Sequence, residues 1–351
     1  MNKGKKIDRD RARGCLLGLA IGDALGATLE FEEPPKYRFS TLLRGPHVDI
    51  TGGGPHQLAP FETTDDTAMA ARLAASLMKH PLFDVSDVAA RYAEWAVDAP
   101  DVGTQTAEVL HRVRTGVPVA KAAADLWHEE GGRPAGNGAL MRTAPIGVAF
   151  ALRPMKELVR AAANDAAITH WDPRCQLASV AFDAAIAAAL TGDMPPDPHD
   201  LRQAAFDSFP FALTHADMRS HDPAAHAAAC DEISSDLMAA TAKDPGLYAS
   251  KLHLHRHQGF VRVAFRLAFW ELLHAPTFEA ALIDVVNRGG DADTNGAITG
   301  ALLGAFYGES AIPSRWAGPM LRAHTRKAKR ALTDVGALLA LADRCAERGR
   351  P

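Results

Sequence analysis

Two acidic clusters combine carboxylates with hydroxyl side chains and lie more than two hundred residues apart. They are Thr64-Asp65-Asp66-Thr67 and Asp291-Ala292-Asp293-Thr294. Four carboxylates in one pocket repel one another strongly at low effective dielectric, so either their pKa values rise or cations neutralise them. Oxygen ligands suit hard ions such as Mg²⁺, Mn²⁺ or Ca²⁺. The clusters therefore predict two halves of one site for a pair of divalent ions.

Helix capping is the simpler interpretation of each cluster. Thr or Asp at an N-cap, with further acid in the first helical turn, is favourable against the helix dipole. The second cluster, however, follows Gly289-Gly290, which lets the backbone turn tightly. Two clusters of the same composition in one chain favour the metal site over capping alone.

These clusters must be positioned by helices. Alanine-rich amphipathic segments dominate the chain, as in the stripe Met69, Leu73 and Leu77, and alternating β-branched runs are nearly absent. The sequence predicts an all-α fold, a single compact multi-helix domain with the binuclear site in a central cleft. Helices are predicted near 9–31, 66–79, 86–98, 103–115, 117–129, 139–151, 155–166, 175–191, 200–208, 222–243, 258–274, 278–287, 294–307 and 328–347. Loops are predicted at 32–63, 131–138, 192–199 and 209–221.

Glycines recur at four-residue spacing in the first of these helices and in the one that follows Asp293. They are Gly14, Gly18, Gly22, Gly26, Gly296, Gly300, Gly304 and Gly308. Each glycine inside a helix costs roughly 1 kcal/mol relative to alanine. Close helix packing can offset that cost, since a ridge without side chains lets two backbones approach. We therefore predict that the two helices are buried neighbours.

Composition limits the classes of protein. In a chain of 351 residues, an apolar content of 47% supports one large core, and we expect one domain over 1–351 with its core at about 9–347. A net charge of −4 argues against a general nucleic-acid surface. No stretch approaches the length of a membrane span without charge. Four scattered cysteines without a CxxC pair fit a reducing cytoplasm, where we expect the protein to be located as a monomer.

The segment Gly22-Asp23-Ala24-Leu25-Gly26-Ala27-Thr28-Leu29-Glu30-Phe31 resembles the ADP-ribosylglycohydrolase family. The match continues in order through Thr63-Thr64-Asp65-Asp66-Thr67, Gly136-Asn137-Gly138-Ala139-Leu140-Met141-Arg142 and Asn287-Arg288-Gly289-Gly290-Asp291-Ala292-Asp293-Thr294. Several ordered matches are more specific than any one alone. By contrast, Gly52-Gly53-Gly54 lacks the strand-turn-helix setting of a nucleotide fingerprint and is interpreted as a loop edging the site.

The resemblance implies a role for each matching residue. Two Mg²⁺ or Mn²⁺ ions would be held by Thr64, Asp65, Asp66, Asp291, Asp293 and Thr294. Glu30, expected at the end of the first helix, and Asp101 would be the catalytic carboxylates, with the choice of base left open. Substrate binding would involve Gly103, Gly136, Asn137, Gly138, Met141 and His170. The sequence departs from some relatives at Arg133-Pro134-Ala135 and Phe260, where adenine-stacking aromatic residues or a tyrosine are expected.

The resemblance also implies a reaction, the hydrolysis of the C1″ glycosidic bond between ADP-ribose and a modified acceptor, most simply an arginine side chain of a protein. Nucleic acid would be involved only as a modified substrate. Two alternatives remain. A noncatalytic ADP-ribose-binding or structural member of the fold would show eroded acidic motifs, whereas a phosphohydrolase with a carboxylate-bridged metal pair would release phosphate.

Overall fold

Alanine-rich apolar segments form helices along most of the chain in the computed structural model, which describes residues 6–34, 42, 44–191, 196–214, 223–323 and 329–348. The helices are α1 (Arg9–Gly26), α2 (Asp65–Lys79), α3 (Val85–Trp95), α4 (Thr104–Arg114), α5 (Val119–Glu129), α6 (Ala144–Ala149), α7 (Met155–Thr169), α8 (Pro173–Thr191), α9 (Pro198–Thr214), α10 (Pro223–Ala239), α11 (Val261–His274), α12 (Phe278–Asn287), α13 (Ala292–Tyr307), the 3-10 turn η2 (Glu309–Ala311), α14 (Ser314–Arg322) and α15 (Lys329–Arg348). Within the described ranges the only β pairings are isolated bridges. The protein is an all-α single domain, as the sequence predicts.

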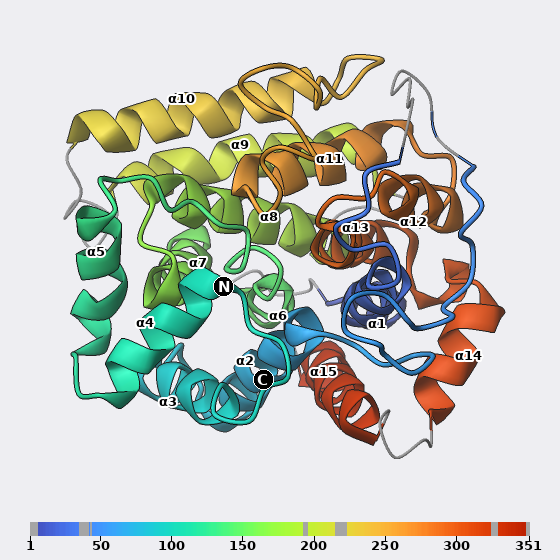
Figure 1. Ribbon diagram of the computed structural model, residues 1–351, viewed down its shortest axis with the longest axis horizontal. Coiled ribbons are helices and arrows are strands. Elements are labelled where there is room, and N and C mark those ends of the chain that lie inside the picture. Colours follow the sequence, from blue (N-terminus) through green and yellow to red (C-terminus); the bar gives the residue numbers. More distant parts are fainter. Residues whose placement is uncertain are drawn as a thin grey trace.

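Helices α1 and α13 form an antiparallel pair at the centre and lie side by side in Figure 1. A Cβ atom built on Gly22 would lie 2.0 Å from the carbonyl oxygen of Gly296, and one on Gly18 would lie 2.2 Å from that of Gly300. Gly14 and Gly304 approach one another in the same way. No side chain fits between these backbones, which confirms the predicted contact between the two glycine ridges.

The remaining helices enclose this pair. Helices α8, α9 and α10 run across the upper part of Figure 1, while α2, α3 and α15 lie along its lower part. Apolar side chains from nearly all of these elements merge into one large buried cluster, and a small second cluster joins α4 to α5. In the part of the chain that the structure describes, no helix is long and apolar enough to cross a membrane.

The structure corrects several predicted boundaries. The first helix ends at Gly26 and not at residue 31, because the backbone turns there and Phe31 takes a positive φ of 64°. The helix predicted at 139–151 is limited to Ala144–Ala149, after a turn. Helix α9 continues through Pro210, where the sequence predicts a loop. The sequence predicts no helix at the position of α14, which is short and contains Pro319.

Part of the predicted loops falls outside the described residues, namely 35–41, 43, 192–195 and 215–221. All four cysteines are free thiols, in agreement with the absence of a disulfide pattern in the sequence.

Candidate metal centre and substrate pocket

Three helix ends converge on the site. Because α1 and α13 are antiparallel, the C-terminal end of α1 adjoins the N-terminal end of α13, where Asp293 lies in the first turn. Asp65 and Asp66 lie in the first turn of α2. The positive end of a helix dipole favours acidic residues at both positions. The fold thus brings together the two acidic clusters that are far apart in sequence.

Glu30 is fixed beside the second cluster by two short backbone hydrogen bonds. The N–H of Phe31 donates to the carbonyl of Gly290 at 2.6 Å, and the N–H of Gly290 donates to the carbonyl of Glu32 at 2.8 Å. Gly290 has a φ of +68°, a conformation that favours glycine. One carboxylate oxygen each from Glu30, Asp291 and Asp293 lie within 4.8 Å of one another. Glu30 therefore places its carboxylate beside the second cluster from a turn beyond α1. The prediction that Glu30 ends the first helix is wrong, because that helix ends at Gly26.

The two clusters are joined through Asp66. Its Oδ2 accepts hydrogen bonds from Thr64 Oγ1 at 3.1 Å and from Thr294 Oγ1 at 3.4 Å. The other oxygen, Oδ1, is buried without a hydrogen-bond partner. Buried carboxylate oxygens without donors are costly unless they bind a cation or a proton.

The electrostatics of these carboxyl groups fit cation binding. Burial, with the charge of neighbouring carboxylates as the next cause, raises the pKa values of Asp65, Asp66 and Asp293 well above the usual range. Burial and then the charge of Asp101 raise the pKa of Glu30 to about 8. Hard divalent ions would relieve both effects, so the donor set fits Mg²⁺ or Mn²⁺.

Asp23 supports the first cluster from within α1. This fully buried carboxylate accepts hydrogen bonds from the backbone N–H and hydroxyl groups of both Thr64 and Thr67. Burial nevertheless raises its pKa to about 6, in opposition to those hydrogen bonds. The sequence shows Asp23 only as a charge inside an apolar run, and its supporting role depends on contacts about 40 residues away.

Asp101 lies opposite Glu30, and a histidine bridges the two. His56 Nε2 is 3.1 Å from Glu30 Oε2 and 3.5 Å from Asp101 Oδ2. His56 belongs to the loop after Gly52-Gly53-Gly54, and all three glycines have positive φ. The triplet is therefore a loop, as the sequence predicts, and it leads to His56 at the site. Nothing in the local sequence around His56 signals this position.

The Gly136-Asn137-Gly138 loop closes the other side of the pocket. The side-chain amide of Asn137 donates to Asp291 Oδ2 at 2.7 Å, which ties the loop to the second cluster. A Cβ on Gly138 would lie 2.9 Å from Cε1 of His170, so the loop packs directly on that ring. Burial lowers the pKa of His170 to about 3, which keeps the imidazole neutral.

A buried polar network holds His170 and the loop in place. The hydroxyl of Thr169 lies 2.8 Å from His170 Nδ1 and accepts a hydrogen bond from Arg142 at 2.7 Å. Arg142 also pairs with Asp165 at 3.0 Å. All of these side chains are buried, so the network fixes the ring that supports the glycine loop.

Together these elements enclose a pocket of about 470 Å³. Most of the predicted site residues line it, namely Glu30, Asp65, Asp101, Gly103, Gly136, Asn137, Gly138, Met141, His170, Asp291, Asp293 and Thr294. Thr64 and Asp66 lie just outside this lining. Gly103 also donates its backbone N–H to Asp65 Oδ2 at 3.2 Å.

A sequence profile of the ADP-ribosylglycohydrolase family matches residues 5–350. The chain belongs to this family. It is 32% identical over 339 residues to the ADP-ribosyl-[dinitrogen reductase] glycohydrolase of Rhodospirillum rubrum, a match that covers 95% of this chain and 97% of that protein.

Other relatives support the same assignment. The ADP-ribosylarginine hydrolase Tri1 of Serratia proteamaculans is 28% identical, over 88% of this chain and 74% of that protein. A solved structure described as an ADP-ribosylglycohydrolase-related protein complex has a TM-score of 0.67 and 30% identity, over 95% of this chain and 98% of that chain. The family predicted from the ordered motifs is therefore confirmed.

Proposed function

We propose that this protein is a metal-dependent hydrolase that removes ADP-ribose from a modified acceptor, an arginine side chain of a protein, by cleaving the C1″ glycosidic bond. The observation that carries the proposal is the convergence of Glu30, Asp291 and Asp293 beside the glycine-loop pocket. The two relatives named above are, as their names state, hydrolases of ADP-ribosylated dinitrogen reductase and of ADP-ribosylarginine.

The proposed cofactors are two Mg²⁺ or Mn²⁺ ions. Their ligands would be Thr64, Asp65, Asp66, Asp291, Asp293 and Thr294, with Glu30 close enough to Asp291 and Asp293 to share in the site. When bound, such ions would orient the ribose hydroxyls and lower the pKa of a water molecule. The unpartnered Oδ1 of Asp66 supports this assignment, because that buried oxygen has no donor from the protein.

The protein's own groups divide the proton transfers. Glu30 faces the second acidic cluster, so we assign it as the base that takes a proton from the attacking water. Asp101 borders both the main pocket and a neighbouring cavity, which suits it to protonate the departing acceptor group. Burial raises the pKa of Asp101, which favours the protonated form required of an acid. Bound divalent ions would lower the pKa of Glu30, which lies beside Asp291 and Asp293, to give the ionised form required of a base. The surrounding carboxylates would stabilise the positive charge that develops on the sugar.

The opposite end of the pocket suits the ADP moiety. A cavity of about 370 Å³ shares Gly136, Gln258 and Gly259 with the main pocket and is bordered by Arg133, Lys251 and His257. Phe260 also lines it and provides an aromatic face for adenine. Arg133 and Phe260, which depart from the pattern of some relatives, thus supply cationic and aromatic groups for a nucleoside diphosphate.

The decisive experiment is to offer arginine-, serine- and nucleic-acid-linked ADP-ribose in parallel, with added Mg²⁺ or Mn²⁺ or with a chelator, and to identify the released product. We expect free ADP-ribose from the arginine conjugate and no release after chelation. Release of phosphate would identify a phosphohydrolase instead. Tight ADP-ribose binding without any release would support the noncatalytic alternative.

A further inference from the structure

Phe31 follows Glu30 in the turn beyond α1 and lines the main pocket. Its φ of 64° lies in the left-handed region of backbone conformation, which bulky side chains rarely adopt. Strain of this kind persists only where the surrounding structure holds it, and it concentrates at functional sites. The backbone conformation of Phe31 therefore needs a physical cause.

Hydrogen bonds on both sides of Phe31 hold this conformation. Its N–H donates to the carbonyl of Gly290 at 2.6 Å, while the N–H of Gly290 donates to the carbonyl of Glu32 at 2.8 Å. The N–H of Glu32 also donates to the carbonyl of Leu29 at 3.1 Å. These bonds use backbone atoms alone. A glycine could make all of them without the steric cost of a Cβ atom, so the turn does not need the phenyl ring.

Phe61 shows how such a ring can be compensated within the fold. Its φ of 67° is almost the same, but its ring packs against the hydrophobic core. By contrast, Phe31 is 56% exposed. The ring of Phe31 therefore gains little from packing within the folded chain, and a bound ligand is the partner that would bury it.

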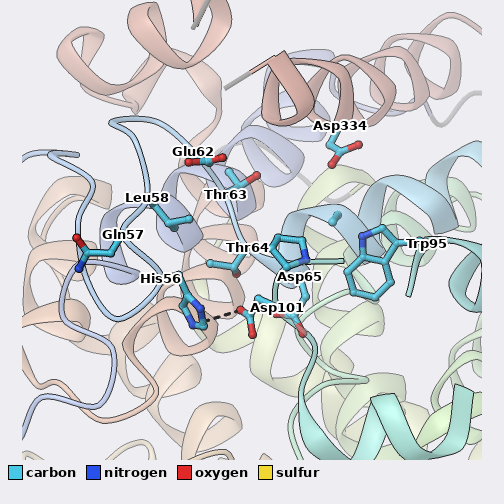
Figure 2. Close-up of a pocket in the computed structure, with 12 residues that line it drawn as sticks. His56, Gln57, Leu58, Glu62, Thr63, Thr64, Asp65, Trp95, Asp101 and Asp334 are labelled. Atoms are coloured by element: carbon cyan, nitrogen blue, oxygen red, sulfur yellow. Dashed lines mark ion pairs between the residues drawn. The ribbon is translucent and has the colours of Figure 1, made fainter. Parts of the chain in front are cut away.

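The neighbours of Phe31 indicate which part of a ligand its ring meets. Its backbone partner directly precedes Asp291 of the second acidic cluster. The carboxylate of Glu30 contacts His56, which extends toward Asp101 in Figure 2. These neighbours are all polar, and among the described residues that line the main pocket Phe31 is the only phenylalanine, tyrosine or tryptophan. It therefore supplies the aromatic surface at the acidic end of the pocket.

A ribose at this end has two chemically different sides. Under the proposed function its hydroxyl groups face the acidic clusters, which leaves its C–H groups available to an apolar partner. A flat aromatic ring provides an apolar surface of suitable size. The adenine is assigned to a different place, and Phe31 is not among the described residues that border that cavity.

We propose that the ring of Phe31 packs on the C–H face of the distal ribose of ADP-ribose and holds that sugar against the acidic clusters. The inference rests on the proposed function and adds a residue that determines affinity for the sugar rather than for the ADP moiety. The backbone strain at Phe31 is then the cost of presenting a ring where glycine would suit the fold better. Binding buries the ring and offsets that cost.

The test compares the affinities of the protein for ADP-ribose and for ADP, measured by calorimetry in the presence of Mg²⁺ or Mn²⁺. ADP lacks the distal ribose and serves as an internal reference. We expect Phe31→Ala and Phe31→Gly to weaken ADP-ribose binding by about tenfold, the scale of one lost apolar contact, and to change ADP binding by less than about threefold. Phe31→Tyr keeps the ring and should bind both ligands within about threefold of the wild type.

Stability provides a second readout, which a purely structural role would move in the opposite direction. Because glycine adopts the left-handed conformation freely, the urea midpoint of Phe31→Gly should equal or exceed that of the wild type and exceed that of Phe31→Ala. Phe61→Gly is the matched variant, since it removes a ring of the same backbone conformation from the core, and it should lower the midpoint. A midpoint for Phe31→Gly below that of Phe31→Ala would show that no strain is stored at Phe31 and would overturn the inference.

Phe211→Ala is the matched control for binding, because it removes an exposed ring from α9, outside the pocket, and should leave both affinities unchanged. Equal losses for ADP-ribose and ADP in Phe31→Ala, no loss for either, or no binding of ADP-ribose to the wild type would overturn the ribose contact. A loss confined to the KM for a conjugate would assign Phe31 to the acceptor and would also overturn it, with the proposed function intact. If no conjugate is hydrolysed but Phe31→Ala weakens ADP-ribose binding selectively, the proposed function fails and the ribose contact stands.

Discussion

Replacing Glu30 by glutamine should stabilise the metal-free protein while it removes activity. Burial and the charge of Asp101 raise the pKa of Glu30 from 4.5 to about 8. Below pH 4.5 the carboxyl is protonated in both the folded and the unfolded chain and has no effect on the pH dependence. Between pH 4.5 and about 8 the unfolded chain releases a proton that the folded chain keeps, so the free energy of unfolding falls as pH rises.

The magnitude follows from the same pKa values. One pKa unit corresponds to about 1.36 kcal/mol, so the ionisation of Glu30 lowers the free energy of unfolding by at most roughly 5 kcal/mol. This value is an upper bound because the neighbouring carboxyl groups share the protons of the site. Glutamine is neutral throughout. We therefore expect Glu30→Gln, relative to wild type, to gain about 2–5 kcal/mol in free energy of unfolding at pH 8.5 in EDTA, and nothing at pH 4.

Urea denaturation at several pH values measures this gain. Glu32→Gln is the matched control, since Glu32 is exposed and lies two residues away, and its stability should follow that of the wild type. With Mg²⁺ or Mn²⁺ present, the same Glu30→Gln variant should lose at least about 10²-fold in turnover, the scale of a lost acid-base group. A stability gain that is independent of pH, or turnover close to that of the wild type, would show that Glu30 is not the crowded base described above.

Three further predictions concern the metal site and the helix pair. Asp66→Ala should abolish metal binding in calorimetry while circular dichroism shows an intact fold, because packing and not the ions holds the helices; an unfolded variant would contradict this. Asp23→Asn should lower metal affinity by about 10–100-fold, the usual cost of a lost supporting contact, and unchanged affinity would remove Asp23 from that role. Gly22→Leu should destabilise by more than about 3 kcal/mol in urea, beyond typical overpacking, since even a Cβ would lie 2.0 Å from the Gly296 carbonyl oxygen; a small effect would show that α1 and α13 can separate.

The helices and the acidic clusters could be predicted because their signals are local. The four-residue glycine spacing predicted the contact of α1 with α13, since only close backbones offset its cost. The metal site could be predicted from short stretches of sequence, because glycines precede Asp291 and hydroxyl residues adjoin the acidic ones in each cluster. Their roles as ligands remain a prediction.

Other features depend on contacts between distant segments. The periodic apolar pattern extends past Gly26, so no local signal indicates the turn that places Glu30. That turn is set by hydrogen bonds to Gly290. His56 comes from a glycine loop. It carries no local signal, because it acquires its place only when segments distant in the sequence pack together, as His56 does with Glu30 and Asp101.

The glycine contact between α1 and α13 has a consequence for synthesis on the ribosome. About 280 residues separate Gly18 from Gly300, and at about 5–20 residues per second the second helix follows the first by roughly 15–60 seconds. During that interval α1, whose residues from Gly14 to Gly26 are buried in the finished fold, has no partner for its apolar surface. The nascent chain therefore depends on chaperones or on transient packing, and premature termination before α13 yields a chain with an exposed, aggregation-prone first helix.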